Sequence, residues 1–158
     1  MTDLVVRRLL IDLQSPFARD WCGGDAFSTA FFNALSMSFP FGEQFFIDAV
    51  RDAVATLPTE VQEKHRADVR GFIGQEATHR RIHSLFNNHL ESQGLVDGWT
   101  ARAGKRLTLM EDADPRHALA VTAATEHFTA LFAEWLLAHP EILDGAEPRL
   151  RTMWLWHS

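Results

Sequence analysis

Glutamate and histidine stand at positions where a helix would carry core-facing apolar residues. In the stretch FIGQEATHRRIH, Glu76, His79 and His83 follow Phe72 and Ile73 at the spacing of one helical face. Because Glu76 and His79 are three residues apart, both can reach one metal ion from the same side of a helix. Carboxylate oxygens and imidazole nitrogens are ligands of divalent transition metals. The stretch therefore indicates a metal site, although Glu-x-x-His also occurs on many solvated helices and does not suffice alone.

Three further segments place a metal-competent group on an apolar face. Glu43 shares its face with aromatic and branched residues, Glu126 lies among small apolar residues, and His157 follows a Met-Trp pair at helical spacing. Buried carboxylates without a counter-charge cost several kcal/mol each and repel one another, and divalent cations remove both penalties. We therefore predict a site for a pair of divalent metal ions, iron or manganese before zinc, with these ligands: Glu43, Glu76, His79, Glu126 and His157.

Less specific interpretations remain open for several of these residues. His83 fits a satisfied core histidine or an outer partner that orients a ligand better than it fits a direct ligand. Glu43 also fits the first turn of a helix, where the helix dipole favours a carboxylate. No catalytic group is expected beyond the metal ligands themselves. Four other histidines lie near polar flanks and are expected at the surface: His65, His89, His117 and His139.

The elements that carry these residues read as helices. Apolar periodicity and capping residues predict helices over about 25–38, 43–56, 60–92, 99–112 and 115–139, and one that begins near 148, with a break at Phe39-Pro-Phe-Gly42. Residues 3–13 suggest a short strand or an extended part of an N-terminal arm over 1–24. Glu43 precedes Pro58 by 15 residues and Glu76 follows it by 18, so an antiparallel hairpin brings them to similar levels. The prediction is an all-α antiparallel bundle, one metal-binding domain over 1–158.

Composition excludes several classes of function. The net charge is -6 and no block of Lys or Arg occurs, which disfavours a nucleic-acid partner. One cysteine, Cys22, rules out an internal disulfide framework, fits a reducing compartment and is expected to be a buried thiol. The sequence has no signal-peptide pattern and no run long enough to span a membrane, so we expect a cytoplasmic protein.

The segments SFPFGEQFFIDAVR, FIGQEATHRRIHSLFN and MWLWHS resemble a bacterial family of predicted metal-dependent hydrolases. The ligand order is also similar to that of ferritin-like di-iron carboxylate proteins, including oxygenases of the arylamine N-oxygenase type. This resemblance implies that Glu43, Glu76, His79 and Glu126 are ligands of a di-iron centre. It implies that His157 stands four residues before a last Glu-x-x-His, which would fall beyond Ser158. The chain is then expected to be C-terminally truncated, with an incomplete fourth ligand helix and at most one tightly bound ion.

Two classes of function follow. The first is a metal-dependent enzyme, either hydrolytic or an oxygen-dependent di-iron enzyme, that acts on a small apolar or aromatic substrate. The second is a non-catalytic metal-binding or helical interaction module, inactive as a truncated chain. Loss of part of the bundle would expose apolar faces around Phe128, Phe132 and Trp135, and a homodimer could cover them.

Overall fold

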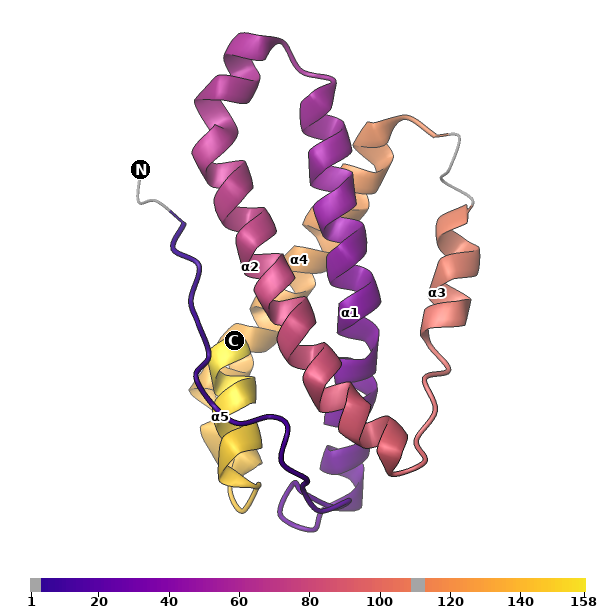
Figure 1. Ribbon diagram of the computed structural model, residues 1–158, viewed down its shortest axis with the longest axis vertical. Coiled ribbons are helices and arrows are strands. Elements are labelled where there is room, and N and C mark those ends of the chain that lie inside the picture. Colours follow the sequence, from indigo (N-terminus) through magenta and orange to yellow (C-terminus); the bar gives the residue numbers. More distant parts are fainter. Residues whose placement is uncertain (1–3, 109–112) are drawn as a thin grey trace.

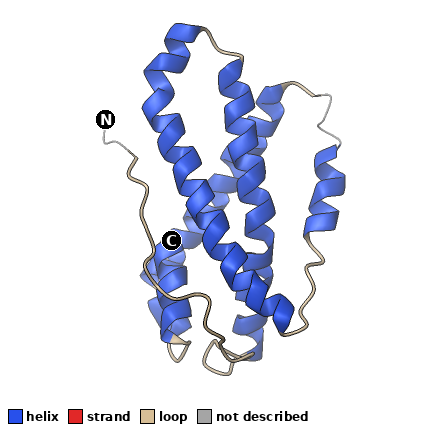
Figure 2. Ribbon diagram, viewed as in Figure 1, coloured by secondary structure: helices blue, strands red, loops and turns tan. Residues whose placement is uncertain are grey.

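Helices make up the regular structure of the chain (Figures 1 and 2). The computed structural model describes residues 4–108 and 113–158, and these ranges contain no strand. Along the chain the elements are α1 (Ala26–Ala55), α2 (Thr59–Ser92), α3 (Thr100–Leu107), α4 (Pro115–Ala138), the 3-10 helix η2 (Pro140–Leu143) and α5 (Pro148–His157). The all-α prediction is confirmed. The end of the helix predicted over 99–112 lies partly outside the described residues.

The helix α1 is continuous, so the predicted break at Phe39-Pro-Phe-Gly42 is wrong. Asp25 caps the helix by accepting a hydrogen bond from the Ser28 backbone N at 2.6 Å, and Pro40 lies inside it. Proline has no N–H to donate to the carbonyl four residues earlier. That carbonyl belongs to Ser36, and it accepts a hydrogen bond from Asn87 Nδ2 of α2 at 3.0 Å. A contact between helices thus satisfies the carbonyl that the proline leaves free.

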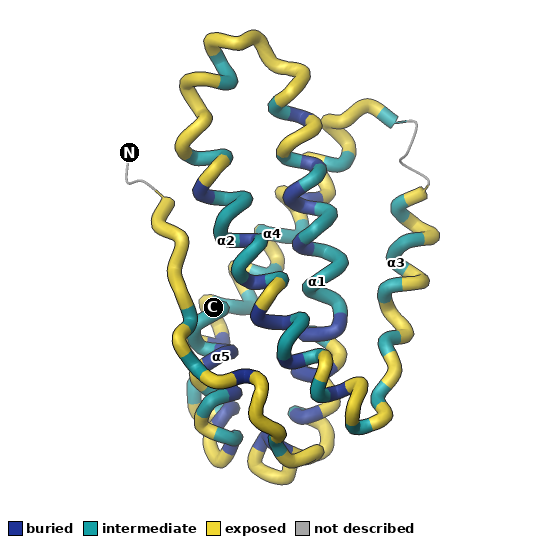
Figure 3. The backbone as a smooth tube through the Cα atoms, in the orientation of Figure 1, coloured by how far each residue is buried: buried dark blue, intermediate teal, exposed yellow. Residues whose placement is uncertain are grey.

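The helices α1 and α2 form a long hairpin, with α4 behind it and α5 at its lower end in Figure 1. Figure 3 shows that buried segments gather where α5 meets the hairpin, whereas the turn joining α1 to α2 is exposed. Core residues there include Trp21, Phe32, Phe86 and Trp154, each at most 3% exposed. This packing holds α1, α2 and α5 together at the level of the candidate ligands.

Residues 4–24 form an extended arm that runs beside α2 and α5 (Figure 1). Of the two alternatives for residues 3–13, the described part follows the extended one. The arm lies on a flat part of α2: a Cβ added to Gly71 would stand 2.7 Å from Leu4 Cβ, and one added to Gly74 would stand 2.8 Å from Val6 Cγ2. Because Gly71 and Gly74 have no side chains, the arm can pack directly against the backbone of α2 at these two positions.

Cys22 marks the other end of the arm. It is 4% exposed, and burial, followed by the charge of Asp25, raises the pKa of its thiol. The prediction of a buried thiol is confirmed. Cys22 makes an isolated β-bridge with Ala146, and the Glu147 backbone N donates to the Trp21 carbonyl at 2.8 Å. The arm is thus joined to the start of α5.

Candidate metal centre

Four helices bring the predicted ligands to one cavity. Its volume is about 170 Å³, and its lining includes all five of them: Glu43 from α1, Glu76 and His79 from α2, Glu126 from α4, and His157 from α5. Glu43, Glu76 and His79 are 2%, 4% and 5% exposed, whereas Glu126 and His157 are half-buried. The apolar stripes of α1, α2 and α5 that carry ligands face the interior, as their spacing predicts. The stripe of α4 around Glu126 does not: Leu119 and Leu137 on it are 38% and 50% exposed.

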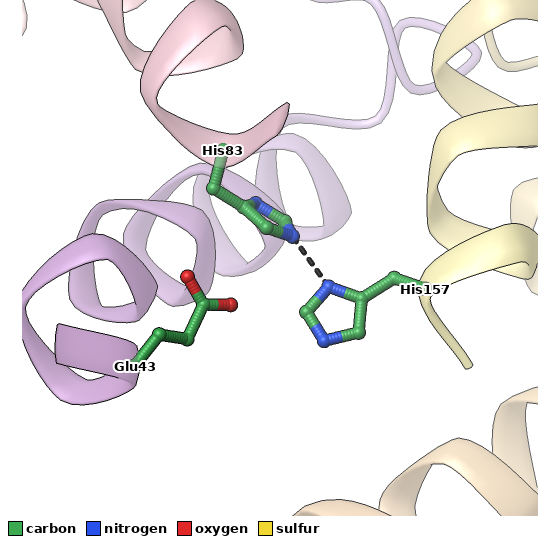
Figure 4. Close-up of side chains that lie close together, drawn as sticks. All are labelled: Glu43, His83 and His157. Atoms are coloured by element: carbon green, nitrogen blue, oxygen red, sulfur yellow. Dashed lines mark hydrogen bonds between the residues drawn. The ribbon is translucent and has the colours of Figure 1, made fainter. Parts of the chain in front are cut away.

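Two groups of possible ligands share one carboxylate. One ligand atom from each of Glu43, Glu76 and His79 lies within 4.8 Å of the others, and the same holds for Glu43, His83 and His157. Figure 4 shows the second group converging from α1, α2 and α5. Ligand atoms stand about 2.0–2.2 Å from a bound ion, so separations of this order suit a common ion after small side-chain movements. Glu126 lines the cavity but belongs to neither group.

Three carboxylate oxygens of the centre have no hydrogen-bond donor among the described residues. Both Glu43 oxygens and Glu126 Oε1 are buried without a hydrogen-bond partner in the part of the chain that the structure describes. Buried polar atoms are nearly always paired, and an unpaired one costs about 1–3 kcal/mol. A cation is the partner that satisfies carboxylate oxygens without any donor. The residues present therefore fit a divalent metal ion.

Burial is the largest cause of a raised pKa in all three carboxyl groups, those of Glu43, Glu76 and Glu126. Burial, followed by the charges of Glu76 and Glu126, raises the pKa of Glu43 to about 9 against a lowering effect of Arg80. Burial and then Glu126 raise the pKa of Glu76 to about 8. Burial also raises the pKa of Glu126. At neutral pH Glu43 and Glu76 therefore hold protons unless a cation replaces them.

The histidines are neutral, which is the form that binds metals. Burial, followed by the charge of Arg7, lowers the pKa of His79 to about 4. Burial, then His79 and Arg7, lowers the pKa of His157 to about 3. Burial, then His157 and His79, holds the pKa of His83 well below its ordinary value. All three imidazoles can therefore offer a lone pair at neutral pH.

His83 lies deeper than the predicted ligands and is fully buried. Its Nε2 stands 2.5 Å from His157 Nδ1, and its Nδ1 stands 2.8 Å from Ser36 Oγ. Ser36 in turn donates to Asn87 Oδ1 at 2.7 Å. Sequence reasoning missed Ser36 and Asn87, because serine and asparagine on a helix carry no signal that separates a buried hydrogen-bond chain from an exposed face.

Arg7 is a third residue that the sequence did not indicate. Its guanidinium lies 5.6 Å from the centroid of the Trp156 ring, and that ring lies 5.2 Å from the ring of His79. A cation over an aromatic face is attracted by the electron density of the ring. The arm thus places the positive charge of Arg7 near His79, one of the candidate ligands.

The other histidines stand apart from the centre. His65, His117 and His139 are exposed as predicted. His89 is half-buried rather than exposed, because its Nε2 donates to the Gln14 carbonyl of the arm at 2.8 Å. None of these four lines the cavity at Glu43.

Fold and site together define a helical protein with a carboxylate-rich candidate metal centre. A family model described as "Predicted metal-dependent hydrolase" matches residues 5–158, and the chain belongs to that family. No curated protein and no solved structure gave a significant match. Among the described helices, none is long and apolar enough to cross a membrane.

Proposed function

We propose that the chain is a metal-dependent enzyme that binds a divalent ion through Glu43, Glu76 and His79. The observation that carries this proposal is that both Glu43 oxygens are buried without a partner among the described residues, and that one Glu43 oxygen lies within 4.8 Å of a ligand atom of each of the other two residues. An imidazole nitrogen among carboxylates favours iron or manganese over calcium and magnesium, which prefer oxygen ligands alone. Glu126, at the wall of the same cavity, adds a further negative charge.

Hydrolysis is the first chemistry that this arrangement supports. A divalent ion supplies a Lewis acid that polarises a carbonyl or phosphoryl oxygen and lowers the pKa of nearby water. Glu126 lines the cavity, has one buried oxygen without a partner, and has a raised pKa, so its carboxylate accepts a proton readily. Phe39 and Phe46 line the cavity from α1 and make part of its wall apolar.

An apolar groove beside the centre supports a small, uncharged apolar or aromatic substrate. Its volume is about 350 Å³, and five aromatic rings line it: Phe31, Phe39, Phe128, Phe132 and Trp154. The groove and the metal cavity share Phe39, Thr129, Ala133, His157 and Ser158. Among the described residues, no Asp, Glu, Lys or Arg lines the groove. A molecule seated there would meet the centre at the His157 side.

The groove also favours a second candidate, an oxygen-dependent di-iron enzyme of the ferritin-like type. Iron would supply redox chemistry with dioxygen, for which apolar molecules without a hydrolysable bond are suitable substrates. The chain's own residues would then bind iron and hold the substrate, and no side chain would need to act as a nucleophile. A metal-binding module without catalysis is the remaining alternative.

Metal analysis tests the metal site that all of these proposals share. Wild-type protein loaded with ferrous or manganous ion and dialysed should retain metal, and Glu76→Ala and His79→Ala should lose most of it. His139→Ala, an exposed histidine, is the matched control and should bind as the wild type does. Equal metal content in all variants would overturn the proposed centre.

Oxygen dependence separates the two chemistries. Loaded protein would be incubated with aryl esters and with arylamines, with and without dioxygen. Product from esters in the absence of oxygen supports the hydrolase, whereas oxygen consumption with an oxidised arylamine supports the oxidative enzyme. Metal retention with neither product favours the non-catalytic module.

A further inference from the structure

We infer that His83 is a direct ligand of a second metal ion, held with Glu43 and His157, so that Glu43 bridges two ions. This assignment rests on the proposed function, because the first ion occupies the group of Glu43, Glu76 and His79. It differs from both roles that the sequence leaves open for His83, a satisfied core histidine and an outer partner that orients a ligand. It also gives the chain two ions where the resemblance implies at most one.

The hydrogen bonds around Ser36 determine which nitrogen of His83 is free. The Ser36 carbonyl can only accept, so the Asn87 atom at 3.0 Å from it is the amide nitrogen, and Asn87 Oδ1 faces the Ser36 hydroxyl. That hydroxyl gives its single proton to Oδ1 at 2.7 Å. His83 Nδ1, 2.8 Å from Ser36 Oγ, must therefore be the donor. The lone pair of the neutral ring is then on Nε2.

Nε2 is the nitrogen that points toward the centre. It stands 2.5 Å from His157 Nδ1 (Figure 4), and His83, His157 and Glu43 form one of the two groups whose ligand atoms lie within 4.8 Å of one another. Histidines that bind metals nearly always donate their other N–H to a fixed acceptor, which sets the tautomer and the ring orientation. Ser36, held by Asn87, is such an acceptor. Pro40 contributes to it, because the carbonyl that Asn87 binds is the one the proline leaves free.

An ordinary core histidine does not account for Glu43. A hydrogen bond from His157 Nδ1 to His83 Nε2 would satisfy both rings without metal. It would leave Glu43, 2% exposed, with two oxygens unpartnered beside them. The first ion satisfies one of these oxygens. A second ion satisfies the other, and a carboxylate can bind one ion with each oxygen.

Only a small movement of the His157 side chain is needed for His83 and His157 to bind the same ion. Two imidazole nitrogens on one ion, each about 2.0–2.1 Å from it, stand roughly 3 Å apart. The present separation of His83 Nε2 and His157 Nδ1 is 2.5 Å. His83 is fully buried and held by Ser36, whereas His157 is half-buried. A small rotation of the His157 side chain makes room for the ion.

Manganese(II) chloride is the probe for this assignment. Wild-type protein should hold two manganese ions per chain, and His83→Gln should hold one. Ser36→Ala keeps the histidine but removes its acceptor, and should weaken the second ion by about 10–100-fold. His89→Gln, on the same helix and outside the cavity, should match the wild type. Two ions sharing Glu43 should also give an exchange-broadened electron paramagnetic resonance spectrum, which His83→Gln replaces with that of an isolated ion.

Each result bears on one proposal. Two ions in both wild type and His83→Gln, or one ion in both, would overturn the role of His83 while leaving the first site intact. No retained ion in the wild type would overturn the proposed function itself. If His83→Gln fails to fold by circular dichroism, Ser36→Ala decides: an unchanged second affinity overturns the inference, and a weakened one supports it.

Discussion

Of the candidate ligands, Glu43 has the greatest need for a cation to compensate the burial of its carboxylate. Its side chain is 2% exposed, has two unpartnered oxygens in the described structure, and faces Glu76 and Glu126. Without metal it binds a proton at neutral pH, since burial and like charge raise its pKa to about 9. Metal and proton therefore compete for the same oxygens.

This competition predicts how stability depends on pH in metal-free protein. The folded pKa values of Glu43 and Glu76, about 9 and about 8, lie above the ordinary value of 4.5. The folded protein thus binds more protons than the unfolded chain, and its free energy of unfolding should fall as pH rises from 6.5 to 9. The lowered pKa values of His79 and His157 act below pH 6.5, where they make stability rise with pH.

Thermal unfolding in chelator across that range measures the effect. Glu43→Gln should flatten the fall in melting temperature, because an amide resembles the protonated acid at every pH. Glu134→Gln, an exposed residue of α4, should leave the fall unchanged. Manganese affinity of the wild type should increase over the same range. A melting temperature that rises steadily from pH 6.5 to 9 would contradict the raised pKa values.

At the scale of the element, Pro40 and Asn87 act as a pair between α1 and α2. Asn87→Ala should lower the free energy of unfolding by about 1–3 kcal/mol, because it leaves the buried Ser36 carbonyl without a partner. Pro40→Ala restores an N–H that can donate to that carbonyl. The double variant should then lose less than Asn87→Ala alone, and urea unfolding of the four proteins gives the coupling energy.

Asn88 supplies the control for that cycle. It is the neighbour of Asn87 on α2 and is exposed. Asn88→Ala should change stability by less than about 0.5 kcal/mol. Equal losses from the two asparagines would mean that the contact with Ser36 does not stabilise the α1–α2 packing.

The packing of the arm against α2 gives a second prediction at the scale of the element. Gly71→Ala puts a Cβ 2.7 Å from Leu4 Cβ and 3.0 Å from the Leu4 carbonyl oxygen, so the start of the arm must move. Trypsin should then cut more rapidly after Arg7 and Arg8. The helix itself should gain about 1 kcal/mol from the replacement of glycine by alanine, so faster cleavage would not reflect global unfolding.

Gly42→Ala is the matched control, because it also lies within a helix and its nearest neighbour, Phe46 Cζ, is 3.9 Å away. Its rate of cleavage in the arm should equal that of the wild type. The same rate in Gly71→Ala would show that the arm accommodates the methyl group without leaving α2.

At the scale of the whole molecule, several large apolar side chains of α1 and α4 are exposed. Phe27 of α1 is 77% exposed, and Phe128, Leu131 and Trp135 of α4 are 70%, 49% and 47% exposed. Apolar surface of this kind commonly marks a place of association. The sequence allows a homodimer, and we predict that a second copy of the chain covers the exposed side chains of α4.

Light scattering coupled to gel filtration tests this association. The wild type should show a dimer at micromolar concentration, and Phe128→Ser with Trp135→Ser should shift it to monomer. Val96→Ser removes another exposed apolar side chain, 85% exposed and outside α4, and should keep the dimer. A wild-type monomer at every concentration would refute the predicted dimer.

Local spacing along the chain determines much of this protein. Helical periodicity places Glu76 and His79 on one face of α2, and sets Glu43 and Glu126 among apolar neighbours. The costs of burying these groups follow from residue type, so a metal centre could be predicted from the sequence. Whether these residues bind metal, and which metal, stays a prediction.

Contacts between elements decided the rest. Pro40 ends a helix when only neighbouring residues are considered, but α1 continues because Asn87, 51 residues after Ser36, binds the freed carbonyl. The free nitrogen of His83 depends on the same contact, and the charge of Arg7 reaches His79 only because the arm folds back along α2. A period of 3.6 residues specifies which side chains share a face. It does not specify which distant donor, acceptor or charge meets them, since that depends on how the helices pack.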